Sequence, residues 1–168
     1  LRGKILVVYE LNGPIRFVHG EDKEKLADAW LKWRTGMDAS DLAIKNMLSS
    51  KGRIDLEALG NSFDTTLKRA HDSPSVSLEV LRQMCVCSRT EVNGKPLLAE
   101  DLIIIIEGAD MLLPQGDISR LSDADRHRIA ICRDWFSDPG FTRADDALLL
   151  IAESSSFVNR RVLRLPQV

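Results

Sequence analysis

Cysteine, net charge and long apolar runs are all scarce in this sequence, and each shortage excludes a class of protein. The 168 residues include three cysteines, which is typical of a reduced cytosolic protein rather than a disulfide-stapled secreted domain. The 23 basic and 25 acidic residues nearly cancel, so we expect no nucleic-acid or membrane binding. The longest apolar runs fall far short of the ~20 residues that a membrane-spanning helix needs, and no signal peptide is evident. We therefore expect a cytoplasmic protein.

The sequence groups no metal-ligating or catalytic side chains together. Cys85 and Cys87 form a lone Cys-x-Cys on a predicted helix, where they point to different faces and have no second ligand pair for zinc. The histidines, at positions 19, 71 and 127, are isolated from one another. The chain has no internal repeat or low-complexity segment, and its length of 168 residues indicates one domain, or the larger part of one, over residues 1–168 of a longer chain.

The rest of the chain is organised around the apolar run Leu102–Ile106, which is followed at once by Glu107 and Gly108. Four of its five residues are β-branched, which favours a strand over a helix. A run without polar alternation predicts a strand that is covered on both faces, as in a parallel sheet between helices. Glu107 then lies at the carboxyl end of the strand, where open α/β sheets bind their ligands.

Strands and helices alternate along the remaining sequence. We predict strands at residues 4–10, 147–152 and 162–165, a strand or ordered loop at 15–19, and helices at 22–34, 40–48, 56–70, 74–88 and 122–136. We also predict that Leu102–Ile106 and Ala147–Ile151 are parallel and adjacent or nearly so, because a single helix connects them. The alternation indicates an α/β domain with a mostly parallel sheet.

The order of these features resembles the second half of an AAA+ ATPase core. The matching parts are the Walker B strand at Leu102–Glu107, its usual continuation from Asp110, the sensor 1 strand at Ala147–Ser156, and the arginine region at Arg160 and Arg161. More weakly, Phe17–Leu26 resembles the pore loop of that family. Residues 36–96 match no part of the family, and we expect them to be a helical insertion.

This resemblance implies a three-layer α/β sandwich of the P-loop NTPase type, with no counterpart of the lid domain. It also implies ATP and Mg²⁺ as cofactors of the full-length protein. Glu107 would be a catalytic acid on the metal side, Asp110 its neighbour in the site, and Ser154 the sensor. Arg160 or Arg161 would reach the nucleotide of a neighbouring subunit, since a guanidinium offers forked donors to phosphate oxygens.

Ordinary structural roles remain open for the same residues. Glu107 and Asp110 would then cap a loop or a helix, and Ser154 would be a loop hydroxyl. Arg160 and Arg161 would be solvated or salt-bridged surface charges. Phe17 would be a core or turn aromatic.

Two departures from the family's pattern separate the function hypotheses. The sequence contains no Gly-x-x-x-x-Gly-Lys-Ser/Thr phosphate loop, and Gly108 takes the place of the water-activating carboxylate. We therefore expect a degenerate AAA+-like module that is not catalytically active alone. It would serve assembly or regulation in a longer ATP-dependent remodelling protein, similar to the N-terminal half of tandem AAA+ proteins. Its partners would be other copies, a downstream AAA+ domain or a protein client. The alternative is an ATP-hydrolysing domain whose phosphate loop lies upstream of Leu1.

Overall fold

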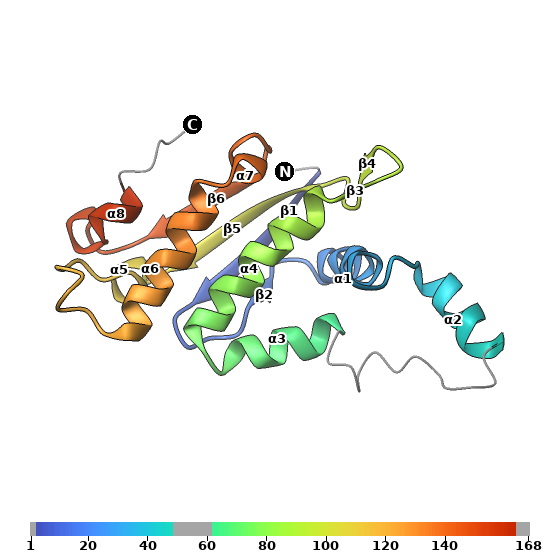
Figure 1. Ribbon diagram of the computed structural model, residues 1–168, viewed down its shortest axis with the longest axis horizontal. Helices are drawn as coiled ribbons and strands as arrows, with labels where there is room; N and C mark the ends of the chain where they lie inside the picture. The colour runs from blue at the N-terminus through green and yellow to red at the C-terminus, as the bar shows by residue number, and fades with distance from the viewer. Residues whose placement is uncertain (1–2, 49–61, 164–168) are drawn as a thin grey trace.

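The computed structural model describes residues 3–48 and 62–163, and its centre is a mostly parallel sheet (Figure 1). The strand order is β2-β1-β5-β6. The strands β1 (Lys4–Glu10), β5 (Asp101–Glu107) and β6 (Ala147–Ile151) are parallel. The short strand β2 (Arg16–Phe17) pairs antiparallel with β1. The predicted α/β class is confirmed, and so is the predicted parallel, adjacent pairing of β5 and β6.

Helices of very different length connect these strands. They are α1 (Gly20–Thr35), α2 (Ala39–Leu48), α3 (Phe63–His71), α4 (Pro74–Arg89), α5 (Ala109–Leu112), α6 (Asp123–Phe136), α7 (Pro139–Thr142) and α8 (Arg160–Leu163), with a 3₁₀ turn, η1 (Ser155–Phe157), before α8. A hairpin of β3 (Glu91–Val92) and β4 (Lys95–Pro96) precedes β5. No helix among the described residues is long and apolar enough to cross a membrane.

Local sequence signals explain where several helices begin and end. Ser122 and Asp125 form a reciprocal capping box at the start of α6. Pro74 occupies the first turn of α4, where its missing N–H costs nothing. The helix α1 ends at Gly36, whose φ of 70° is a left-handed conformation that glycine adopts without strain. These three boundaries agree with the sequence prediction.

The two faces of the sheet differ in their burial. Ile5, Val7, Leu102, Ile104 and Ile106 point to one face and join the hydrophobic core with side chains of α1, α3, α4 and α6. The opposite face, which we call the open face, consists of Leu6, Val8, Ile103, Ile105, Leu149 and Ile151, and none of these is buried. The sequence predicted cover on both faces of β5, and the described helices provide it on the first face only.

Two predicted elements differ from the structure. The expected last strand at residues 162–165 is wrong for its described part, because Val162 and Leu163 belong to α8. Asn159 accounts for this, since its Oδ1 accepts a hydrogen bond from the Arg161 N–H at 3.1 Å and so caps the helical turn. The helix predicted at 56–70 begins at Phe63 within the described residues, and its earlier part lies outside them.

Candidate functional site

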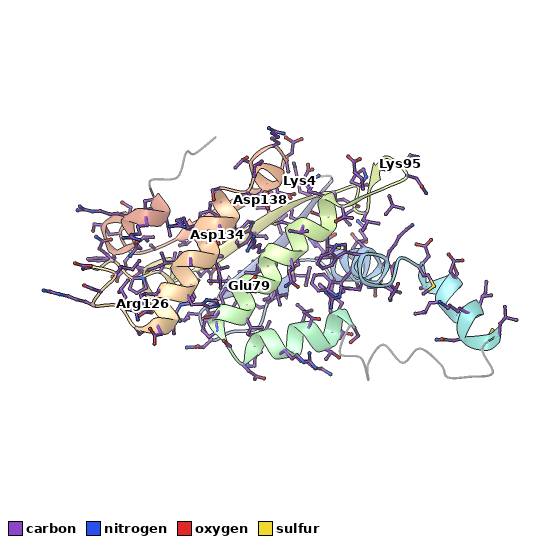
Figure 2. All side chains as sticks on the ribbon, in the orientation of Figure 1. Lys4, Glu79, Lys95, Arg126, Asp134 and Asp138 are labelled. Carbon is purple, nitrogen blue, oxygen red and sulfur yellow. The ribbon has the colours of Figure 1, made fainter. Side chains whose placement is uncertain are left out.

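The carboxyl ends of β1, β5 and β6 form the edge at which the sequence places the candidate site. In Figure 2, Lys4 marks the opposite, amino-terminal end of the sheet, and Arg126 projects from α6 near the carboxyl edge. Glu10 and Glu107 are the last residues of β1 and β5, and they lie opposite each other in the parallel pair. Because both side chains are about half exposed, this edge is open to a ligand.

Arg16 lies between the two carboxylates. Its Nη2 is 3.4 Å from Glu10 Oε2 and 3.9 Å from Glu107 Oε2. Arg16 reaches both because it lies opposite Val8 in the antiparallel β1–β2 pair, on the open face of the sheet. The carboxylate of Glu107 therefore already has a cationic neighbour.

Gly108 and Asp110 follow β5 directly. Gly108 caps α5 with a φ of 67°, a conformation that a residue with a side chain rarely adopts. Its amide lies before the short helix that carries Asp110 in the first turn, where an acid is favourable because it faces the unpaired N–H groups. The structure therefore gives Asp110 a helix-start position and leaves Glu107 as the acid closest to the end of the strand.

Ser154 lies three residues after the end of β6. Its Oγ lies 2.8 Å from Ser156 Oγ and accepts a hydrogen bond from the Ser156 N–H at 3.3 Å. This is a local turn that caps η1. Ser154 follows β6 on the strand that is adjacent to β5, so it shares the carboxyl edge with Glu107.

Arg160 and Arg161 lie in α8 rather than in a loop, and both are exposed. The Arg160 N–H donates to Gln115 Oε1 at 3.1 Å. Asn159 holds the turn in place, because its Nδ2 donates to the Pro114 carbonyl at 3.1 Å and its own N–H donates to the Leu113 carbonyl at 2.8 Å. The segments after β5 and after β6 are thus joined, and the turn that carries both arginines follows the carboxyl end of β6.

Other candidates from the sequence have structural positions. Phe17 is partly buried, and its ring packs edge-on against Phe63 at a centroid distance of 6.0 Å. Cys85, Cys87 and Cys132 are buried free thiols, and burial raises the pKa of Cys132 to about 12. Among the described residues, no three His, Cys, Asp or Glu side chains are grouped to hold a metal ion.

A charged network at the other end of the sheet was not predicted from the sequence. Arg89, at the end of α4, donates to Asp101 Oδ1 at 2.8 Å and from its Nε to Asp146 Oδ2 at 3.1 Å. Lys4 pairs with Asp101 as well. Asp146 Oδ1 also accepts the Leu102 N–H at 2.7 Å. Four segments that are distant in sequence therefore meet at the starts of β1, β5 and β6.

Hydrogen bonding sets the charge state of this network. Burial alone would lower the pKa of Arg89, but its hydrogen bonds to Asp146 and Asp101 outweigh burial and raise it. The hydrogen bonds from Lys4 and then Arg89 lower the pKa of Asp101. Arg89 and Asp101 are therefore ionised at neutral pH.

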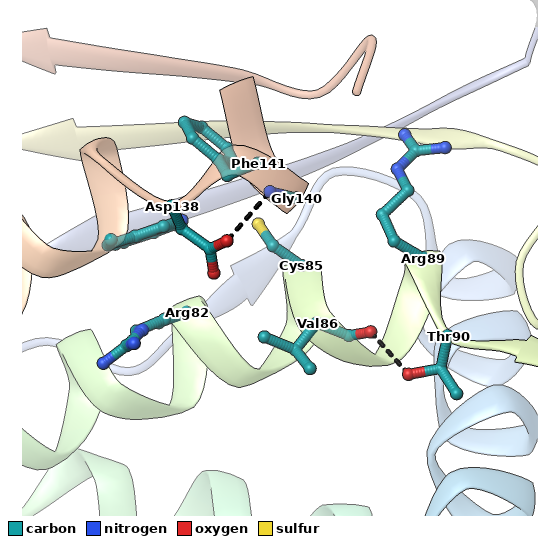
Figure 3. Close-up of a pocket in the computed structure, with 9 residues that line it drawn as sticks. Arg82, Cys85, Val86, Arg89, Thr90, Asp138, Gly140 and Phe141 are labelled. Atoms are coloured by element: carbon teal, nitrogen blue, oxygen red, sulfur yellow. Dashed lines mark hydrogen bonds between the residues drawn. The ribbon is translucent and has the colours of Figure 1, made fainter. Parts of the chain in front are cut away.

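A small pocket of about 290 Å³ lies next to this network, between α4, α6 and α7 (Figure 3). It is lined by Arg82, Cys85, Val86, Arg89, Thr90, Trp135, Asp138, Gly140 and Phe141. Asp138 Oδ1 accepts the Gly140 N–H at 2.8 Å at its wall. Because Arg89 also binds residues at the amino ends of β5 and β6, the pocket lies away from the carboxyl edge and from Glu107.

A mostly parallel sheet packed against helices is consistent with a Rossmann-like α/β domain. Residues 2–168 match the family described as "AAA+ chaperone, N-terminal Rossmann-like domain", and the chain belongs to this family. The match covers almost the whole chain, including the region 36–96 that the sequence motifs left unassigned. No curated protein and no solved structure matches the chain.

Proposed function

We propose that this domain is a degenerate AAA+-type module that assembles or regulates a larger ATP-dependent remodelling protein and does not hydrolyse ATP itself. The observation that carries the proposal is Gly108. It follows Glu107 at the point where the resemblance requires a water-activating carboxylate, and it has no side chain. Loss of a general base costs roughly 10²–10⁴ in rate. Its left-handed backbone also favours glycine at this position.

The phosphate-binding chemistry supports the same proposal. The sequence has no glycine-rich loop followed by Lys and Ser or Thr, and this loop is what holds the phosphates of ATP and its Mg²⁺ in P-loop NTPases. Glu107 is the one strand-end acid of β5 that could contact Mg²⁺, and Arg16 already lies beside it. ATP and Mg²⁺ would then be bound by the other parts of the assembly.

The arginines of α8 give the module a means to act on a neighbour. Arg160 and Arg161 are exposed, and their hydrogen bonds use the backbone N–H groups, which donate to Gln115 Oε1 and Asn159 Oδ1. An exposed guanidinium in this turn would suit a γ-phosphate on an adjacent subunit, because it offers forked donors to phosphate oxygens. Ser154 would be the sensor at the same edge, since it lies three residues after the end of β6.

The test is ATP turnover and oligomer size of the full-length assembly with Arg160→Ala and Arg161→Ala made singly. Arg143→Ala is the matched control, because Arg143 is exposed and lies after α7, near the amino-terminal end of β6. We expect at least one α8 variant to lower turnover about tenfold or more, as loss of a phosphate-contacting arginine does. Unchanged turnover and unchanged oligomer size in both variants would remove the trans-acting role.

Calorimetry of residues 1–168 with Mg-ATP tests the degenerate character separately. We expect no binding in the micromolar range, because nothing in the sequence forms a phosphate loop. Micromolar binding would favour the alternative of an ATP-hydrolysing domain. The two experiments test separate parts of the proposal. A module that does not bind ATP need not contribute an arginine to its neighbour, so either result can be negative without the other.

A further inference from the structure

The outer edge of β6 has no partner strand among the described residues. β6 is the last strand of the sheet, and within the described residues it pairs with β5 alone. All five of its residues are apolar, and Leu149 and Ile151 are 50% and 51% exposed. Such a strand presents a row of N–H and C=O groups that pair readily with another strand. It contains no proline, charge or bulge that would discourage pairing.

The opposite edge of the same sheet is protected. β2 has two residues, carries the charged Arg16, and follows Pro14 closely. Short edge strands, charges and prolines are the features by which proteins prevent unwanted strand addition. The β2 edge of the sheet is thus protected against strand addition, and the β6 edge is not.

The apolar surface at the unpaired edge of β6 continues across the open face of the sheet. Leu149 lies beside Ile105, and Ile105 lies beside Val8, in the register of the three parallel strands. A strand added at β6 would place every second side chain on this face. It would therefore gain apolar contacts as well as main-chain hydrogen bonds.

The charged residues on both sides of β6 indicate which kind of polypeptide could pair with this edge. Asp145 lies two residues before the strand and Glu153 two residues after it, both exposed and without an ion pair in the described part of the chain. In an antiparallel pair of two copies centred on Leu149, Asp145 would lie opposite Glu153 of the second copy. Like charges directly opposite each other are destabilising, so a second copy fits this edge poorly.

We propose that β6 is a docking site for an extended, apolar segment of a partner polypeptide that is bounded by Lys or Arg residues at both ends. The segment adds a strand by main-chain hydrogen bonds, and its basic ends pair with Asp145 and Glu153. This inference requires neither nucleotide nor Arg160 and Arg161, so it stands independently of the proposed function.

The test uses a synthetic peptide with an alternating Val and Thr core and two lysines at each end. Binding is measured by calorimetry and by backbone amide shifts in two-dimensional NMR. We expect the shifts to concentrate on β6. A peptide with glutamates at the ends, and a lysine peptide with N-methylated core amides, should each bind at least about tenfold more weakly.

Substitution in the domain completes the test. Leu149→Lys places a charge on the exposed strand and should weaken binding about tenfold or more. Val92→Lys is the control, because Val92 is an exposed apolar residue on the separate β3–β4 hairpin. The proposal is overturned if both end-charge peptides bind equally, if the N-methylated peptide binds as well as its parent, or if β6 instead pairs two copies in a concentration-dependent dimer.

Discussion

Glu10 and Glu107 end two parallel strands side by side, with one cation shared between them. The two residues are register partners of β1 and β5, and the guanidinium of Arg16 approaches both, at 3.4 Å and 3.9 Å. Paired carboxylates on an exposed edge would otherwise repel each other. The arrangement keeps an acidic edge in place at little cost, because exposed ion pairs each contribute about 0–1 kcal/mol.

The first prediction separates the structural role of Glu107 from a metal role. Glu107→Gln should change the free energy of unfolding by less than about 0.5 kcal/mol, because the side chain is exposed and its pair with Arg16 is loose. If Glu107 contacts Mg²⁺ in the full-length assembly, the same variant should raise the Mg²⁺ concentration needed for ATP turnover. Glu10→Gln is the control, and an equal shift in both variants would contradict a specific metal contact.

The second prediction concerns Gly108. Gly108→Glu restores a carboxylate but should destabilise the domain by about 1–2 kcal/mol, because φ is 67° at this position. Space is not the obstacle, since an added Cβ meets no atom within 4 Å. Gly20→Glu is the matched control, because Gly20 also has free space but ordinary backbone geometry in the first turn of α1. Urea denaturation curves of the two variants should differ, and equal midpoints would refute the backbone argument.

The third prediction concerns the network at the amino ends of the strands. Arg89→Ala should destabilise the domain by about 3 kcal/mol, because it leaves the fully buried carboxylate of Asp146 without its cation. Arg82→Ala, in the same helix and lining the same pocket, should cost much less, since Arg82 forms no ion pair in the described residues. Thermal and urea unfolding measure both, and similar losses would mean that α4 packing alone is responsible.

The fourth prediction is a pH dependence with a defined direction. The pKa of Asp101 is lowered in the folded state, first by Lys4 and then by Arg89. The stabilisation from this group is therefore complete above the ordinary aspartate pKa of about 3.9 and is lost as the pH falls through the lower folded value. Asp101→Asn should flatten this part of the stability curve, measured by urea unfolding between about pH 6 and about pH 3. A variant that loses stability with acid as steeply as the wild type would exclude Asp101 as a source.

The strands could be predicted from the sequence because their signal is local. The apolar runs at Lys4–Glu10, Leu102–Ile106 and Ala147–Ile151 are recognisable without knowledge of their neighbours. The helix boundaries at Ser122 and Gly36 depend on capping residues that are likewise local. The parallel pairing of β5 and β6 followed from the expectation that one helix joins them in a right-handed crossover.

What the sequence missed depends on residues that meet only in the folded chain. Arg89 and Asp146 are 57 positions apart, and no sequence pattern joins them. Val162 and Leu163 have strand-like side chains, but Asn159 and its contact with Pro114 make them helical. The run Leu102–Ile106 has apolar residues on both faces, so it could not reveal that one face is open. At the candidate site, Arg16 was not predicted because β2 is only two residues long.

The register of β1 also determines when this domain can fold during synthesis. Lys4 pairs with Asp101, which is 97 positions later. Before β5 is made, the only strand in the described chain that pairs with β1 is the two-residue β2. At roughly 5–20 residues per second, the first strand waits roughly 5–20 seconds on the ribosome before β5 is made. During that interval its apolar residues have only the two-residue β2 and the early helices to cover them. The pairing of β1 with β5 is therefore a late step in the folding of this sheet.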